Sequence, residues 1–464
     1  MSIQVIVNPR QRIGGVVQSE ISVGNKILIT PNCAPRIKKS LDFGIICDLT
    51  YLEKKPTVTV FEIDSVEDIM RERRATAHQF DLSMKLVDSN FKKMSDETVM
   101  IIDPRTEAFY YNLGKSGKID VKSKLINIVG FQEKVAKVLE SMDTEHYNAG
   151  LTALEEQDLL ASYVDSYATY QAKQGADIVL PPAPLVTKSN LSLKLMMKVN
   201  ERTRLLANMG RIRSYPAMYI PMQSGIFKDD KTEMSEKILR YIREKAPFNR
   251  FLFLKLAYYN HIGAEKSWRK GYGKFMREVD LIKEEFDNSF AVVLLDAGEE
   301  GYILLMNGID VYSESSTGTH AFARSTKKKE DDEEAVIGPP QRGKYLHPEF
   351  GLISFDRLLS EIGEDAILPC NCPACQKYHG NLNMNTNAEE WNISRRSHLI
   401  NMKLRDIDIL NRGIEEGNVF DIVHKIDRGH DRNLIDLIPN DRLNNLNVSK
   451  KMNGKEVSVK QPSR

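Results

Sequence analysis

Three of the chain's five cysteines lie close together in a segment that reads LPCNCPACQKYHG. Cys370, Cys372 and Cys375 form a C-x-C-x2-C pattern, which lets three thiolates converge on one ion from a tight turn. Structural zinc sites usually have four nitrogen or sulfur ligands. His379 and His398 are the candidates for the fourth, and His398 is favoured because a helix can return its ring onto the turn. An iron–sulfur cluster would usually need a fourth cysteine. The sequence therefore predicts a structural zinc site, with reduced thiols in a packed turn as the alternative.

A second group of candidate functional residues, mostly polar, lies at or near the ends of short apolar runs. Asp103 follows VMII, Gln223 follows MYIPM, Asp296 and Gly298 lie just after AVVLL, and Ser313 lies in GIDVYS. Carboxylates in such places suit nucleophilic or acid–base chemistry. Each of them alone is also an ordinary turn residue.

The elements that must position these residues are apolar runs that alternate with amphipathic, helix-like segments. Strands alternating with helices indicate a parallel sheet, and the number of units favours an α/β fold of the (β/α)8 (TIM) barrel type. The pattern by itself does not separate a barrel from an open sheet. The predicted strands are the runs at 26–31, 99–104, 176–182, 217–225, 250–257, 291–298 and 308–313.

Composition narrows the class of protein. The net charge of +1 over 464 residues gives no global field for a polyanion. The sequence has no N-terminal apolar leader and no long apolar run, so we expect a cytoplasmic protein with no membrane segment. We expect five parts: an N-terminal part with the first barrel strand and an unplaced insertion, the barrel body, a mobile charged loop, the zinc segment with a closing helix, and a basic disordered tail. Their boundaries are 1–98, 99–323, 324–343, 344–425 and 426–464.

The cysteine pattern, followed by SHLINMKLRDIDILNRGIEEG, resembles the zinc subdomain of the tRNA-guanine transglycosylases. The segment 290–324, which reads FAVVLLDAGEEGYILLMNGIDVYSESSTGTHAFAR, resembles the archaeal-type segment in which a G-A-G turn precedes a strand reading G-x-D-[LV]-[FY]-D-S. Three other strands of the family have counterparts here. The strand with the first catalytic Asp resembles VMIIDPRTEAFYY, the Gln-Gly strand resembles MYIPMQSG, and the opening strand resembles GNKILITPNCAPRI. The resemblance is strongest over 290–420 and gives no counterpart for 50–98.

This resemblance implies a (β/α)8 TIM barrel with an inserted zinc-binding subdomain, and it implies a specific activity. Members of the family replace guanine in a polynucleotide by a 7-deazaguanine such as preQ0 or preQ1, through a covalent bond between an Asp and C1′ of the nucleotide. A carboxylate suits attack on such a carbon, and the base must leave its stack to be reached. The substrate polymer is tRNA or DNA, and the family often forms homodimers or heterodimers with a homologue.

When the motifs are matched, the resemblance implies roles for particular residues. Asp103 matches the first catalytic Asp, Gln223 the base-reading Gln, Gly298 the glycine turn and Asp310 the acidic residue before the nucleophile. Asp296 is expected beside the substrate. The nucleophile position is occupied by Ser313, which is a poor nucleophile without an activating base, so that Asp296, Asp310 or Glu314 would have to compensate. The alternatives are a non-catalytic subunit that binds nucleic acid or pairs with an active homologue, and a zinc-containing barrel with unrelated chemistry.

A basic and aromatic stretch, HIGAEKSWRKGYGKFMR, follows one predicted strand. Such mixing suits phosphate contact and base stacking. It can also be an ordinary solvated loop. The residues expected to contact nucleic acid are Lys266, Arg269, Lys270 and Lys274.

Overall fold

We describe the fold from a computed structural model. It describes residues 3–38, 40–47, 51–66, 96–111, 121–228, 232–257, 268–315, 344–347, 351–362, 368–379, 382 and 386–417. Lys266, the predicted charged loop at 324–343 and the predicted tail at 426–464 lie outside these residues, as does much of the segment without a counterpart in the resemblance.

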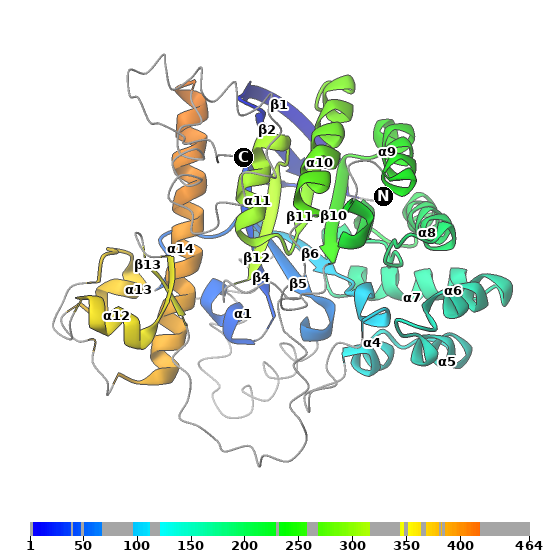
Figure 1. The fold of residues 1–464 in the computed structure, drawn as a ribbon, viewed down its shortest axis with the longest axis horizontal. Helices are drawn as coiled ribbons and strands as arrows, with labels where there is room; N and C mark the ends of the chain where they lie inside the picture. Colours follow the sequence, from blue (N-terminus) through cyan, green and yellow to red (C-terminus); the bar gives the residue numbers. More distant parts are fainter. Residues whose placement is uncertain are drawn as a thin grey trace, which may run out of the picture.

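The centre of the molecule is a nine-stranded parallel sheet that curves into a nearly closed barrel (Figure 1). Its first and last strands, β8 and β9, follow each other in the chain with only Ala217 between them, so one stretch of chain pairs with β7 at its start and with β10 beyond. The remaining neighbours include β12 and β4, which join the end of the barrel to its beginning. The strands are β4 (Asn32–Ile37), β5 (Val58–Glu62), β6 (Val99–Asp103), β7 (Ile178–Val179), β8 (Tyr215–Pro216), β9 (Met218–Gln223), β10 (Phe251–Ala257), β11 (Ala291–Leu295) and β12 (Val311–Ser315).

Continuous apolar sequence explains these strands. All residues of β5, β6, β10 and β11 are buried, as expected when a parallel sheet is covered on one side by helices and filled on the other. Helices cover the outside of the sheet, and one of them, α9, begins with a capping box in which Thr232 and Ser235 bond reciprocally. They are α1 (Ser40–Cys47), α8 (Asn190–Asn208), α9 (Glu233–Lys245), α10 (Trp268–Glu285) and α11 (Gly298–Leu304).

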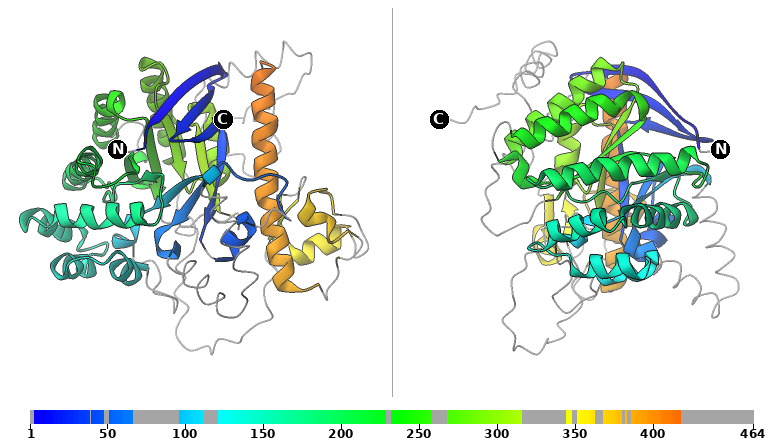
Figure 2. Two further views of the ribbon diagram at one scale, coloured as in Figure 1. Left: turned by 180° about the vertical axis from the view of Figure 1, so that it is seen from behind. Right: turned by 90° about the vertical axis from the view of Figure 1, so that its right-hand side faces the viewer.

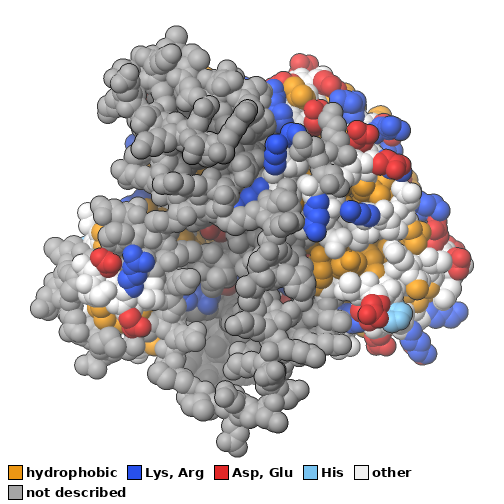
Figure 3. Space-filling model, viewed as in Figure 1, with side chains coloured by type: hydrophobic (Ala, Val, Ile, Leu, Met, Phe, Trp, Pro, Cys, Tyr) orange, Lys and Arg blue, Asp and Glu red, His pale blue; other side chains and the backbone are white. Residues whose placement is uncertain are grey.

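Among the described residues between β6 and β7, four further α-helices extend the molecule on one side (Figure 2). They are α4 (Val121–Val129), α5 (Glu133–Ser141), α6 (Tyr147–Glu156) and α7 (Leu160–Lys173). Over this side of the surface, positive and negative side chains are interspersed (Figure 3), which agrees with the balanced net charge. Among the described helices, none has the length and apolar character to cross a membrane.

The N-terminal strands form a separate antiparallel sheet of β1 (Val5–Ile13), β2 (Val16–Val23) and β3 (Lys26–Thr30). Their apolar side chains, such as Val16, Ile21 and Leu28, join the same core as the barrel. The run at 26–31 was expected to be a barrel strand. That expectation is wrong, because this run pairs with β2, and the first parallel strand is β4 instead.

The C-terminal part packs beside the barrel and has a hydrophobic cluster of its own, which includes Tyr345, Phe355 and Trp391. The helix α14 (Ala388–Glu415) belongs to both regions, since Trp391 lies in this cluster while Ile407 and Leu410 lie in the barrel core. The smaller elements are β13 (Lys344–His347), β14 (Gly351–Ser354), α12 (Phe355–Ile362) and α13 (Pro373–Gln376).

Asp310 immediately precedes β12 and therefore lies at the end of the barrel opposite Asp103, which is the last residue of β6. One of its carboxylate oxygens accepts hydrogen bonds from Lys283 Nζ and from the amide of Val292, and the other lies 3.4 Å from Thr30 Oγ1. Both side chains of the Asp310–Lys283 pair are fully buried. Asp310 is thus placed to hold the barrel together and does not join the other predicted catalytic residues.

We expect Asp310→Ala to lower the free energy of unfolding by about 3–5 kcal/mol, because the Lys283 ammonium would remain buried without its partner. Chemical denaturation measures this change. Glu133→Ala removes an exposed ion pair with Lys137 and serves as the control, for which we expect no measurable change. Equal stability of the Asp310→Ala protein and the wild type would contradict the structural role.

Candidate active site and metal cluster

The predicted metal ligands come together. One atom from each of Cys370, Cys372, Cys375 and His398 lies within 4.8 Å of all the others, and all four residues are buried. His398 Nδ1 is 3.6 Å from Cys372 Sγ and 3.2 Å from Cys375 Sγ. A tetrahedral site with bonds of zinc length would place its ligand atoms roughly 3.3–3.8 Å apart. The cluster therefore has the composition and size to bind a metal ion.

Two elements position the ligands. Pro373 opens the short helix α13, and the amides of Cys375 and Gln376 bond to the carbonyl of Cys372, which folds the cysteines into one turn. His398 comes from α14, as expected. His379 is not part of the cluster, since its ring nitrogen lies 3.3 Å from the carbonyl of Cys370.

Neighbouring side chains support the cluster. The ring of Tyr345 stacks on His398 with centroids 4.5 Å apart, and its hydroxyl lies 3.5 Å from Cys375 Sγ. Arg405 Nη1 lies 3.7 Å from Cys370 Sγ. Groups of this kind fix the orientation of metal ligands and stabilise thiolate charge.

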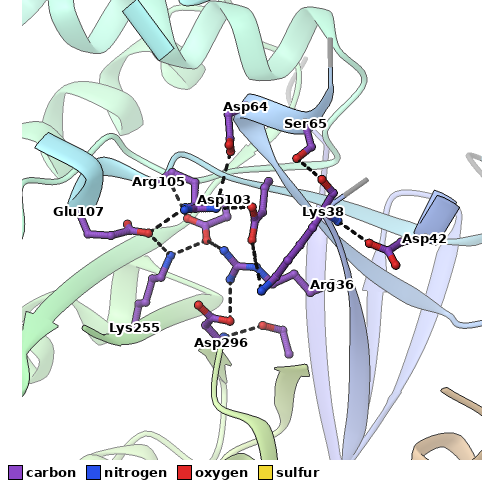
Figure 4. Close-up of polar contacts among 12 residues, drawn as sticks. Arg36, Lys38, Asp42, Asp64, Ser65, Asp103, Arg105, Glu107, Lys255 and Asp296 are labelled. Atoms are coloured by element: carbon purple, nitrogen blue, oxygen red, sulfur yellow. Dashed lines mark hydrogen bonds and ion pairs between the residues drawn. The ribbon is translucent and has the colours of Figure 1, made fainter. Parts of the chain in front are cut away.

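A layer of charged side chains occupies the end of the barrel where the strands terminate (Figure 4). We call it the charged layer. Its members are buried except Lys38, whose side chain is 20% exposed. They are Arg36, Lys38, Glu62, Asp103, Arg105, Glu107, Lys255 and Asp296.

The ion pairs of the charged layer cross the interior of the barrel. Lys255 Nζ, from β10, lies 2.7 Å from Asp103 Oδ2 on β6, although these strands are not neighbours. Arg36, from β4, places Nη2 2.8 Å from the same Asp103 oxygen and Nη1 3.5 Å from Asp296 Oδ1. The side chains therefore point inward, and one guanidinium connects carboxylates from both sides of the barrel.

Arg36 and Arg105 share a further carboxylate. Arg36 Nε donates to Glu62 Oε1 at 2.8 Å, while Arg105 pairs with the other oxygen of Glu62. Arg105 Nε and Lys255 Nζ both contact Glu107 Oε1, at 3.0 and 2.7 Å. Arg36, Arg105 and Lys255 thus each contact at least two carboxylates, which spreads the charge over the layer.

The charges of these cations determine the ionisation of the two aspartates. Burial alone would raise the pKa of Asp103, but Lys255, Arg36 and Arg105 outweigh it and lower this pKa to about 2. Burial is likewise outweighed at Asp296, whose pKa is held well below its usual range by Arg36, Lys38 and Lys255. Both side chains are therefore carboxylates at neutral pH and cannot donate a proton there.

Ser313 supports Asp296 from the neighbouring strand. Its hydroxyl accepts a hydrogen bond of 2.7 Å from the amide of Asp296, and its carbonyl accepts one of 3.0 Å from Ala297. Asp296 itself has a φ of +59°, a left-handed conformation that is uncommon outside glycine. Gly298 follows as the first residue of α11.

Gln223 ends β9 and donates toward the hydroxyls of Tyr110 and Tyr111, at 3.3 and 3.4 Å. Asp103 and Gln223 are the last residues of their strands, and Asp296 follows the end of β11. Ser313 lies in the middle of β12. Among the residues expected to contact nucleic acid, Lys270 and Lys274 are exposed one turn apart on α10.

The rest of the basic and aromatic stretch differs from the expectation. Arg269 is buried and pairs with Glu300 at 2.8 Å. Tyr272 and Phe275 are buried in the core rather than available for stacking. The helical period explains this, because these residues fall on the face of α10 that covers the sheet.

The sequence interpretation missed Arg36, Glu62, Arg105, Glu107 and Lys255. A signal was present, since the runs FLFLKLA and NCAPRI each carry one charged residue inside a buried strand that is otherwise uncharged. A charge buried in a parallel strand must be paired, so these positions indicate an internal ion-pair network.

Comparisons with known proteins add no assignment, because no protein-family model matches the chain and no curated protein matches it.

We expect the purified protein to contain about one metal ion per chain, and Cys372→Ser to lose it together with thermal stability, because the ligand set is incomplete without that thiolate. Elemental analysis and a thermal melt measure both. Cys33→Ser removes a buried cysteine outside the cluster and should leave the metal content unchanged. A wild-type protein without metal, or a Cys372→Ser protein that retains it, would contradict the metal site.

A second prediction concerns acid unfolding. The pKa of Asp103 is about 2 in the folded protein and about 4 in an unfolded chain, so its ion pairs stabilise the fold above about pH 4 and lose this effect as the pH falls toward 2. Lys255→Met removes the cation that lowers this pKa most. We therefore expect its acid-unfolding midpoint, followed by circular dichroism, to move to higher pH. Lys137→Met is the exposed control, and identical midpoints for Lys255→Met and wild type would refute the coupling.

Proposed function

We propose that the protein is a base-exchange enzyme similar to the tRNA-guanine transglycosylases. It would replace guanine in tRNA or DNA by a 7-deazaguanine of the preQ0 or preQ1 type through a glycosyl–enzyme intermediate. The scaffold would be a (β/α)8 barrel in which β8 and β9 count as one strand. Enzymes of that architecture carry their reacting groups where the strands end.

One observation carries the proposal. Asp103, Asp296 and Ser313 are far apart in the sequence, but Arg36 contacts both carboxylates and Ser313 bonds to the Asp296 amide. The resemblance predicts a pocket with two acidic functions at these positions. Ionised carboxylates facing one another in a buried layer suit a reaction that passes through a cationic sugar carbon.

The ligand cluster of three cysteines and one histidine would bind zinc in a structural role. Three thiolates and one imidazole form a closed ligand set with no open position for a substrate. Zinc there would fix α14, which packs against both the C-terminal cluster and the barrel. A reducing compartment such as the cytoplasm would keep these thiols available for the ion.

The polynucleotide would approach the same end of the barrel. α10 begins after β10, and its exposed Lys270 and Lys274 are suited to contact phosphates. As in the family that it resembles, the protein would work as a homodimer or with a homologous subunit.

A second candidate is a non-catalytic subunit that binds nucleic acid or pairs with an active homologue. It is favoured by the state of Asp103, which has no exposed surface and whose two oxygens contact Lys255, Arg36 and the amide of Arg105. A carboxylate engaged in this way is a weak nucleophile.

The test is incubation with radiolabelled guanine or preQ0 and either tRNA or duplex DNA. We expect label in one of the two polymers, and Asp103→Asn should lower the rate by about 10²-fold or more because the charged layer loses an anion. Asp165→Asn, which alters a surface pair with Arg202, is the control with unchanged activity. No label in either polymer, together with stable co-purification of an active homologue, would support the non-catalytic candidate instead.

A further inference from the structure

We propose that Asp296 supplies the carboxylate that attacks C1′ of the target nucleotide, and that Ser313 is the residue that positions it. This inference rests on the proposed function and assigns the nucleophile within it. Three carboxylates could replace the missing Asp at position 313, and their contacts separate them.

Asp310 and Glu314 each form an ion pair away from the charged layer. Asp310 is paired with Lys283 at the opposite end of the barrel. Glu314 pairs at 3.0 Å with Lys403 of α14, which lies outside the barrel wall. Neither carboxylate faces the charged layer, so neither can share a substrate with Asp103.

One carboxylate oxygen of Asp296 accepts no hydrogen bond from the described residues. Its Oδ1 lies 3.5 Å from Arg36 Nη1, whereas Oδ2 is buried and has no hydrogen-bond donor within the described part of the chain. A buried carboxylate oxygen without a donor is costly, and such a group calls for a functional explanation. Oδ2 of Asp103, by contrast, contacts both Lys255 and Arg36.

The backbone of Asp296 is held in an uncommon conformation. Its φ of +59° lies in the left-handed region, where a residue with a side chain is strained. The two hydrogen bonds to Ser313 hold this turn against β12. Such strain persists where the surrounding structure enforces it, and the consequence here is that the carboxylate is aimed into the charged layer beside Arg36 (Figure 4).

Ser313 does not act as the nucleophile. Its buried oxygen already accepts the Asp296 amide at 2.7 Å. Its contribution is to fix the position from which the neighbouring carboxylate reacts.

The reaction would proceed in two displacements without any change of oxidation state. Asp296 Oδ2 forms a bond to C1′ while the bond from C1′ to N9 of guanine breaks, and guanine leaves with the electron pair and takes a proton from water. The incoming 7-deazaguanine loses its N9 proton to water, attacks C1′, and releases the carboxylate. Asp103 and Arg36 remain ionised throughout.

The experiment is to trap the covalent enzyme–polymer complex and to map the modified peptide by mass spectrometry. We expect the adduct on Asp296. Asp296→Gly suits the left-handed backbone, so it should fold, which a thermal melt checks, while losing both the adduct and exchange by about 10³-fold or more. Asp165→Asn should behave as wild type in both assays.

Ser313→Ala tests the positioning role. We expect kcat to fall about 10- to 100-fold with KM little changed, and Ser313→Thr, which keeps a hydroxyl, to recover most of the rate. Equal kcat values for Ser313→Ala and wild type would overturn that role.

The remaining outcomes separate the inference from the function on which it rests. An adduct on Asp103 or another carboxylate, or an Asp296→Gly protein that still forms one, would overturn the assignment of Asp296 while base exchange itself stands. A wild-type protein that incorporates no base into tRNA or DNA would overturn both.

Discussion

The barrel of this protein depends on the pairing of charges inside it. Arg36 has no exposed surface and touches Glu62, Asp103 and Asp296, which come from three other strands or strand ends. Removing a charge of this kind from water costs several kcal/mol, and only close counter-charges offset it. The arrangement of β4, β5, β6 and β11 around one guanidinium is therefore fixed by electrostatics as much as by apolar packing. A ligand that enters this layer has to replace an existing ion pair or use an oxygen that is not yet engaged.

The helix α14 extends the same constraint to the metal cluster. At one end it contributes His398 and packs Trp391 in the C-terminal cluster, and at the other it packs Leu410 in the barrel core. Between them, Arg396 pairs with Asp42 of α1 at 2.6 Å and Lys403 pairs with Glu314 of β12. A metal ion bound by His398 would thus restrain a helix that also contacts two elements of the barrel. Within the described residues, none of the four cluster residues belongs to the charged layer, so the packing of α14 is what connects the two.

Sequence patterns located most of the barrel strands and the metal cluster, because both depend on local features. A continuous apolar run is required wherever a strand is buried on both faces, and the cysteine spacing defines a turn. The run KILIT is equally apolar, yet it forms β3, since its antiparallel partner is set by the preceding hairpin. The charge inside FLFLKLA indicates that Lys255 must be paired. The identity of its partners, and of the partner of Arg269, was not predictable, because neither segment alone shows which distant residue lies next to it. Asp310 resembled a catalytic residue in sequence, although its position at the start of a strand gives it a structural partner.

Asp296 and Ser313 show how two positions that are distant in sequence can lie side by side at one place in the barrel. β11 and β12 are adjacent parallel strands, so the residue after one strand lies next to a residue within the other. The Asp296 amide and the Ser313 hydroxyl are 2.7 Å apart although seventeen positions separate them in the chain. A carboxylate at the end of β11 can therefore occupy nearly the same region of the barrel as a carboxylate on β12. The cost is backbone strain, because Asp296 takes a left-handed conformation that glycine would adopt without strain. The hydrogen bond from the Asp296 amide to Ser313 of β12 offsets part of this strain.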